Sequence, residues 1–150
     1  MKLIPTVVFS LGALMLSQAA QAQFAKPEDA IKYRKNAFFV MQQHYARVGA
    51  MAAGRVPFDA KVAQENAETA LFMAKLPWAA FGEGTDKGDT KSKPEIWKEM
   101  DKFKDGSDKM VAEMQKLVAA ARTGNLESVK ASFNATSNTC KTCHDAYREK

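Results

Sequence analysis

The chain has 150 residues and a net charge of +5, with 22 lysines and arginines against 17 acidic residues. Its two cysteines are too few for a domain held together by several disulfides. Its scattered basic residues lack the aromatic-plus-basic pattern that is typical of nucleic-acid binding. We therefore expect one globular domain with its own hydrophobic core, an ordinary solvated surface and no nucleic-acid partner.

The first 22 residues have the three parts of a secretory signal peptide. Lys2 provides a positive start, residues 3–16 form an apolar run, and the small residues Ala20 and Ala22 flank the cleavage signal. The run is too short for a membrane span, and no second long apolar run follows it. We expect cleavage after Ala22, which leaves an exported, soluble domain of residues 23–150 and, with Lys2 removed, lowers the net charge from +5 to +4.

Glycine and proline divide the exported chain into four amphipathic segments. The first runs from Pro27 to about Val48, and Arg34 stands in its apolar seam where a hydrophobic residue is expected. The second begins at the N-cap Asp59 and ends near Lys75. The third runs from Pro94 to about Ala121, and the fourth follows the N-cap Asn125. Four such helices, joined mostly by short connections, predict an all-α antiparallel four-helix bundle.

Two expectations concern packing within this bundle. Residues 76–93 form the longest irregular segment, and we expect Trp78 and Phe81 to anchor it to apolar surface. On the second helix, an alanine-rich set permits close helix contact. The larger side chains expected on or near its buried side are Val62, Thr69, Phe72, Met73 and Leu76.

Cys140 and Cys143, followed at once by His144, form the C-x-x-C-H motif of covalent c-type haem attachment. Each thiol adds to one haem vinyl group, and the imidazole reaches the iron from the same side. Positions i, i+3 and i+4 share a helix face, and both cysteines continue the apolar seam of the fourth helix. A redox dithiol would follow a strand, and a zinc site would need His44 as a fourth ligand. We predict one covalent haem c in the bundle interior and no disulfide.

The second axial position of the iron distinguishes two functions. A filled position predicts a six-coordinate low-spin electron carrier, and an open position predicts a five-coordinate haem that binds gases. No methionine or histidine follows His144, so a second ligand has to come from an earlier helix, and Met41 is the best candidate. Methionines at seam spacing are usually packing residues. If the site is open, Phe38 covers it with hydrocarbon, which favours small uncharged gases such as nitric oxide and carbon monoxide. The remaining candidate ligands are His44, Met51, Met73, Met100, Met110 and Met114.

Three side chains bear on these alternatives. Arg34, one turn before Phe38, is placed to bind the haem propionates. The alternative is an arginine at the end of the bundle that extends its charged group into solvent. Arg148 is expected near the proximal side, where it also suits the helix C-terminal dipole. Phe38 offers no acid or base for peroxide cleavage, so we do not expect an enzyme.

The chain resembles the cytochrome c-prime family, the class II c-type cytochromes. The resemblance implies a four-helix bundle, a five-coordinate high-spin haem, a periplasmic location and a homodimer packed through the first two helices. It is also consistent with a periplasmic redox partner. The matching segments are Lys32–Arg34, Leu76–Trp78, Phe81–Gly82, Pro94–Trp97, Cys140–His144 and Asp145–Arg148.

The resemblance also implies roles for particular residues. Phe38 takes the distal position, which is Leu in many members and Met in low-spin relatives, and its phenyl ring is expected to slow or weaken ligand entry. Lys35 replaces a Gln often found beside Arg34. The implied set is Cys140 and Cys143 as thioether sites, His144 as the axial ligand, Arg34, Lys35 and Glu95 as haem contacts, and Arg148 beside the proximal histidine.

Overall fold

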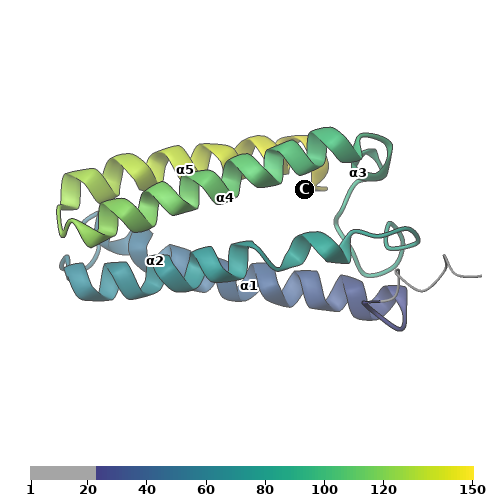
Figure 1. Cartoon of the computed structure of the whole chain (residues 1–150), viewed down its shortest axis with the longest axis horizontal. Coiled ribbons are helices and arrows are strands. Elements are labelled where there is room, and N and C mark those ends of the chain that lie inside the picture. The colour runs from purple at the N-terminus through teal and green to yellow at the C-terminus, as the bar shows by residue number, and fades with distance from the viewer. Residues whose placement is uncertain (1–22) are drawn as a thin grey trace, which may run out of the picture.

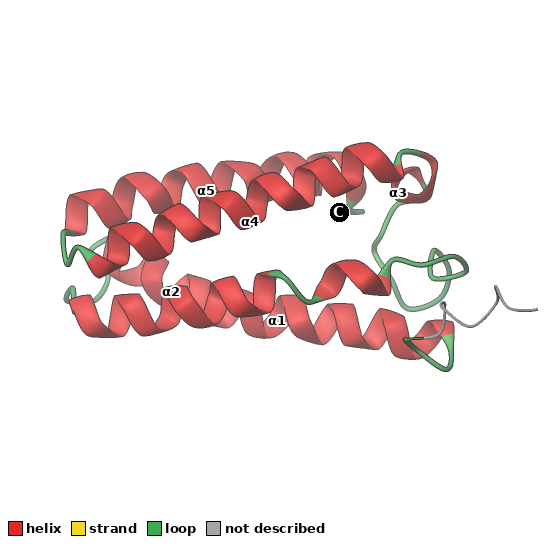
Figure 2. Ribbon diagram, in the orientation of Figure 1, coloured by secondary structure: helices red, strands yellow, loops and turns green. Residues whose placement is uncertain are grey.

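A computed structural model of the chain describes residues 23–150, so the predicted signal peptide lies outside the described residues. Four long helices form an antiparallel bundle, with α1 and α2 as one pair and α4 and α5 as the other (Figures 1 and 2). The predicted fold class is confirmed. The elements are α1 (Pro27–Ala52), α2 (Ala60–Ala74), the 3₁₀ helix η1 (Pro77–Ala80), α3 (Glu95–Lys98), α4 (Met100–Arg122) and α5 (Leu126–Tyr147).

The helix ends follow from local capping. The side chain of Asp59 accepts a hydrogen bond from the Val62 N–H at 3.0 Å, and that of Asn125 accepts one from the Ser128 N–H at 2.9 Å. Both predicted N-caps are therefore confirmed. Gly124 turns the chain between α4 and α5 with φ +68, a conformation that favours glycine. None of the helices between residues 23 and 150 meets the length and apolarity that a membrane crossing requires.

Two predicted helix boundaries were wrong. The first helix continues beyond Val48 to Ala52, because Gly49 remains helical. The predicted third helix is interrupted at Glu99, where φ −126 and ψ 40 lie outside the helical region, so α3 is a single turn and α4 begins after it. Ile96 before the interruption and Phe103 after it are both buried, as the seam predicted, but Met100, which the seam also placed inward, is 39% exposed.

The buried face of α2 consists of small side chains. Val62 and Phe72 are 40% and 65% exposed, so their predicted burial was wrong. The helix packs against both α1 and α4, and a stripe of alanines allows the closest approach to two neighbours at once. Val62 and Phe72 are consequently turned outward, whereas Leu71 is partly buried against the central cluster. The buried residues of α2 are Ala63, Asn66, Ala67, Ala70 and Ala74.

Two apolar clusters fill the bundle. The central cluster is built from α1, α2, α4 and α5, and its buried members are Val48, Ala67, Ala70, Ala74, Met110, Met114, Leu117, Val118, Ala121 and Val129. The end cluster lies where α5 ends and the 81–93 segment crosses the bundle (Figure 1). It consists of buried Phe81, Ile96 and Phe103, with Phe38, Trp78, Trp97, Cys143 and Tyr147 packed against them.

Helices α1 and α5 meet through an aromatic contact that requires a glycine. The rings of Tyr45 and Phe133 stack with centroids 4.4 Å apart, and the Tyr45 hydroxyl donates to the Phe133 carbonyl at 2.7 Å. A Cβ on Gly49 would lie 2.5 Å from the Phe133 ring. The absence of a side chain there lets the ring lie against the α1 backbone.

We predict opposite effects for two helical glycines. Gly49→Ala overpacks the Phe133 contact and should lower the free energy of unfolding by about 1–3 kcal/mol. Gly106→Ala, in α4 with nothing within 4 Å of the added Cβ, should raise it by about 0.5–1 kcal/mol through higher helix propensity. Urea unfolding followed by far-ultraviolet circular dichroism measures both. Equal effects of the two substitutions would contradict the packing described here.

Candidate haem site

The two cysteines face the bundle interior from the last turns of α5. Cys140 packs against the central cluster and Cys143 against the end cluster. Both are half-buried, and they are not joined to each other. Burial raises the pKa of both thiols. The structure therefore turns two thiols, one helical turn apart, toward the apolar interior of the bundle, as their place on the seam predicted.

His144 follows the second thiol and is the more exposed of the three motif residues. Burial lowers its pKa, and the positive charge of Arg148 acts in the same direction. Both changes favour the neutral imidazole, which is the form that binds a metal. His144 and Arg148 line one open depression together with Lys91, Asp145, Glu149 and Lys150.

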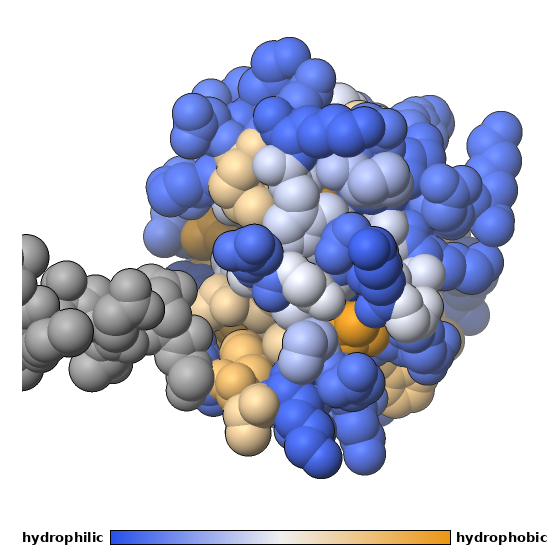
Figure 3. Space-filling model, turned by 90° about the vertical axis from the view of Figure 1, so that its right-hand side faces the viewer, coloured by the Kyte–Doolittle hydropathy of each residue, from blue (hydrophilic) through white to orange (hydrophobic). Residues whose placement is uncertain are grey.

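Arg148 lies just beyond the end of α5, in extended backbone that the sequence did not predict. The helix ends at Tyr147, and Arg148 is extended, with φ −124 and ψ 133. It forms an isolated antiparallel bridge with Ser92, and the Lys93 N–H donates to the Tyr147 carbonyl at 3.0 Å. The chain thus leaves the helix before Arg148 and pairs with the 81–93 segment, and the expected place of Arg148 on the proximal side of the haem stays a prediction. This end of the molecule is mostly hydrophilic, with small apolar areas (Figure 3).

Phe38 on α1 contributes to the same cluster as Cys143. Its ring meets Trp78 edge-on, with centroids 5.5 Å apart, and lies 6.4 Å from Phe81. The one polar atom of the Trp78 side chain is already used, because its Nε1–H donates to the Ala74 carbonyl at 2.6 Å. The two aromatic rings beside Phe38 therefore offer it no free polar atom. As predicted, Trp78 and Phe81 anchor their segment to apolar surface.

Two of the predicted alternative ligands, Met41 and His44, lie elsewhere on α1. Met41 packs against the central cluster, as does Cys140, whereas Phe38 packs against the end cluster. The Nδ1 atom of His44 is 2.9 Å from the Asn66 side-chain oxygen on α2. His44 is thus engaged between α1 and α2, as a helix-pairing residue.

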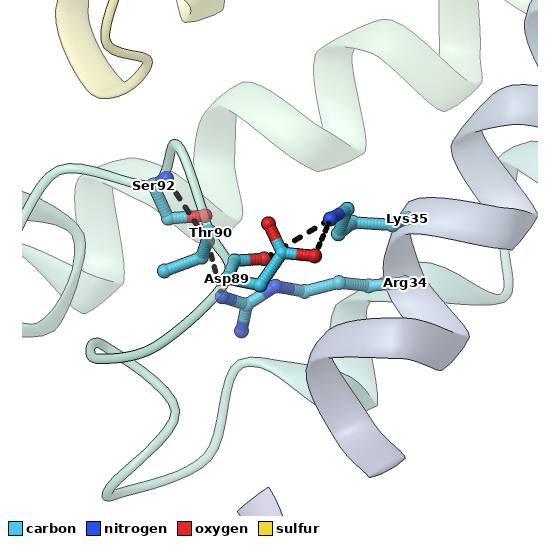
Figure 4. Close-up of polar contacts among 5 residues, drawn as sticks. All are labelled: Arg34, Lys35, Asp89, Thr90 and Ser92. Carbon is cyan, nitrogen blue, oxygen red and sulfur yellow. Dashed lines mark hydrogen bonds and ion pairs between the residues drawn. The ribbon is translucent and has the colours of Figure 1, made fainter. Parts of the chain in front are cut away.

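Arg34 is 2% exposed, and its guanidinium binds the chain that crosses the end of the bundle. One terminal nitrogen donates to the Ala80 carbonyl at 2.9 Å and to Thr85 Oγ1 at 2.8 Å. The other donates to the Thr85 carbonyl at 2.7 Å. It also donates to Thr90 Oγ1 at 2.9 Å (Figure 4). The guanidinium carbon also lies 4.3 Å from the centre of the Phe81 ring. Burial lowers the pKa of Arg34 to about 10, which leaves it charged at neutral pH.

The predicted haem contacts Lys35 and Glu95 lie at the surface. Lys35 pairs with the carboxylate of Asp89 and also donates to the Asp89 carbonyl at 3.1 Å (Figure 4). Glu95 opens α3, and its carboxylate is 3.9 Å from the Lys98 ammonium. In this structure both side chains bind other protein groups, and their contact with haem stays a prediction.

The residues present fit a covalently attached haem c. Two inward thiols at i and i+3 and an imidazole at i+4 form the complete donor set, and aromatic rings provide apolar surroundings for a porphyrin. The fold and the site together define a c-type haem protein built on a four-helix bundle.

Comparison with known proteins identifies the family. The family model for Cytochrome C' matches residues 29–148, and the chain belongs to the cytochrome c' family, whose members carry one covalent haem c. Cytochrome c' of Rubrivivax gelatinosus is 49% identical over 129 residues, which cover 85% of this chain and all of that protein.

Solved structures agree with this assignment. The crystal structure of the Rubrivivax gelatinosus protein matches with a TM-score of 0.82 at 48% identity, covering 85% of this chain and all of that one. A nitric oxide complex of a mutant cytochrome c prime from Alcaligenes xylosoxidans matches with a TM-score of 0.80 at 42% identity, covering 85% of this chain and 99% of that one.

We predict that haem attachment depends on both thiols. Replacing Cys140 or Cys143 by Ser should leave one thioether, and replacing both should leave none, because the chain has no other cysteine. Denaturing extraction followed by mass spectrometry of the polypeptide measures what remains attached. Lys141→Ala, at an exposed position between them, is the control and should keep its haem. Haem that stays bound to the double variant would contradict the assignment.

Proposed function

We propose that the protein binds small uncharged diatomic gases, nitric oxide and carbon monoxide, at an iron held by His144 alone. Cys140 and Cys143 are the attachment points, and the bound haem supplies an iron able to take one further ligand. The observation that carries the proposal is the position of Phe38, which has no ligating atom and packs with Cys143 against the end cluster. The nitric oxide complex of the Alcaligenes xylosoxidans mutant supports it.

The chemistry of the distal side favours such ligands over ions and peroxide. A wall made of Phe38, Trp78 and Phe81 offers no hydrogen bond to a bound anion, and burying a charge against hydrocarbon is unfavourable. The same wall holds no acid or base to assist the cleavage of peroxide. The proposed role is therefore gas binding accompanied by electron transfer, without enzymatic turnover.

We predict that carbon monoxide changes the absorption spectrum of the reduced protein and that Phe38 limits its entry. Phe38→Ala removes the ring that covers the distal side, so the association rate constant should rise by at least tenfold, equivalent to about 1.4 kcal/mol of barrier. Flash photolysis of the carbon monoxide complex measures this rate. Phe39→Ala, one residue along and 63% exposed, is the matched control and should leave the carbon monoxide association rate unchanged.

An unchanged spectrum would favour the alternative function. The iron would then already carry two protein ligands, with Met41 of α1 as the candidate for the second, and the protein would be a low-spin electron carrier. A loss of that spectrum in Met41→Leu would identify the ligand.

We also propose that the protein works in the periplasm. The signal peptide at residues 1–22 provides the export signal, and covalent attachment consumes both cysteines. The exported domain carries a net charge of +4, which is suited to an anionic redox partner.

A further part of the proposal is a homodimer formed through α1 and α2. Among residues 23–150, most of the exposed large apolar side chains belong to these two helices or the turn between them. A second copy covering these side chains would explain why Val62 and Phe72 of α2 point outward. The exposed set is Phe39, Val40, Val56, Val62 and Phe72, with Met100 of α4 outside it.

We predict that Phe72→Lys separates the dimer into monomers. The substitution places a charge on each copy where two apolar surfaces meet, and Phe72 is 65% exposed in the single chain, so the fold itself should tolerate it. Sedimentation equilibrium measures the mass. Ala119→Lys, which adds the same charge to the exposed side of α4, should remain dimeric. Wild-type protein that sediments as a monomer at micromolar concentration would contradict the dimer.

A further inference from the structure

We propose that Arg34 is a positioning residue for the distal side: it holds Phe81 and Trp78 in place, and these two rings restrict the movement of Phe38 when a gas enters. The inference rests on the proposed function and deepens it, because it assigns control of ligand entry to a residue that does not touch the ligand. It differs from the predicted contact between Arg34 and the haem propionates, because here Arg34 affects ligand entry through the rings of Phe81 and Trp78.

The first step is the attachment of the 81–93 segment to α1. Four of the five N–H donors of Arg34 bind oxygens of Ala80, Thr85 and Thr90. A buried charge is costly unless its donors are satisfied, so the segment has one strongly preferred position relative to α1. The segment carries Gly82, Gly84 and Gly88, which would otherwise allow the backbone many conformations.

The second step passes from Arg34 to the rings. The guanidinium lies against the Phe81 face, and Phe81 stacks on Trp78 with centroids 6.2 Å apart and planes 21° apart. Trp78 is fixed at its other end by the bond from its Nε1–H to the Ala74 carbonyl. The two rings therefore form a supported surface beside the end cluster.

The third step is the contact with Phe38. Trp78 meets its ring edge-on at 5.5 Å, and Phe81 lies 6.4 Å away. A phenyl ring that covers a binding site has to turn or shift before a ligand can enter. The surface formed by Trp78 and Phe81 opposes such a shift, so loosening this surface should lower the barrier to entry.

The test is a double-mutant cycle on the haem-loaded protein. Arg34→Gln should raise hydrogen exchange in the 81–93 segment and speed carbon monoxide association about five- to tenfold, as lowering a barrier by roughly 1–1.4 kcal/mol does. In a Phe38→Ala background the same substitution should leave the association rate unchanged, because the ring on which it acts has gone. A rate increase that persists in that background would overturn the inference and favour direct contact with the haem.

Two further variants keep the test decisive. Asp89→Asn breaks the exposed ion pair between the same segment and Lys35 but leaves the Phe81 contact, so the association rate should stay within twofold of wild type. Phe81→Leu keeps an apolar core residue and removes the stacked ring, and it replaces Arg34→Gln in the test if that variant does not fold. Its carbon monoxide association rate should rise, and this rise should disappear in the Phe38→Ala background.

The outcomes separate this inference from the proposed function. If wild-type protein binds no carbon monoxide, the proposed function fails and the inference fails with it. If wild type binds the gas and Phe38→Ala accelerates it, but neither Arg34→Gln nor Phe81→Leu does so, the inference alone is overturned.

Discussion

The inward orientation of the last turns of α5 determines the chemistry of this protein. Because Cys140 and Cys143 lie on the apolar seam, packing of α5 brings both thiols to the interior, and His144 follows on the adjoining face. The same packing places Cys143 in one cluster with Phe38 of α1. The attachment site and the ring of Phe38 thus come from two helices at opposite ends of the chain, brought together by the bundle.

The 81–93 segment joins the two sides of this site. On one side it receives the buried guanidinium of Arg34 and the ion pair of Lys35. On the other it pairs through Ser92 with the tail that follows α5. The buried charge of Arg34 is stabilised only while its donors remain satisfied. Order in this segment and order in the aromatic rings beneath it therefore depend on each other.

Features set by local spacing could be predicted from the sequence, and features set by distant contacts could not. The four long helices, the caps at Asp59 and Asn125 and the inward cysteines follow from periodicity and short-range hydrogen bonds. The outward position of Phe72 could not be read in this way, because apolar spacing does not distinguish a core face from an exposed one. Arg34 was recognisable as an anomaly in a seam, but its partners lie in an irregular segment whose path depends on tertiary contacts.

The proposed gas binding needs an iron that is bound on one side by His144 and faced on the other by hydrocarbon. The electron paramagnetic resonance spectrum of the purified ferric protein reports the number of strong axial ligands most directly. A high-spin signal, with no sulfur-to-iron charge-transfer band in the accompanying absorption spectrum, is the result that this account predicts. A low-spin signal with such a band would show that a methionine fills the distal position and would contradict it.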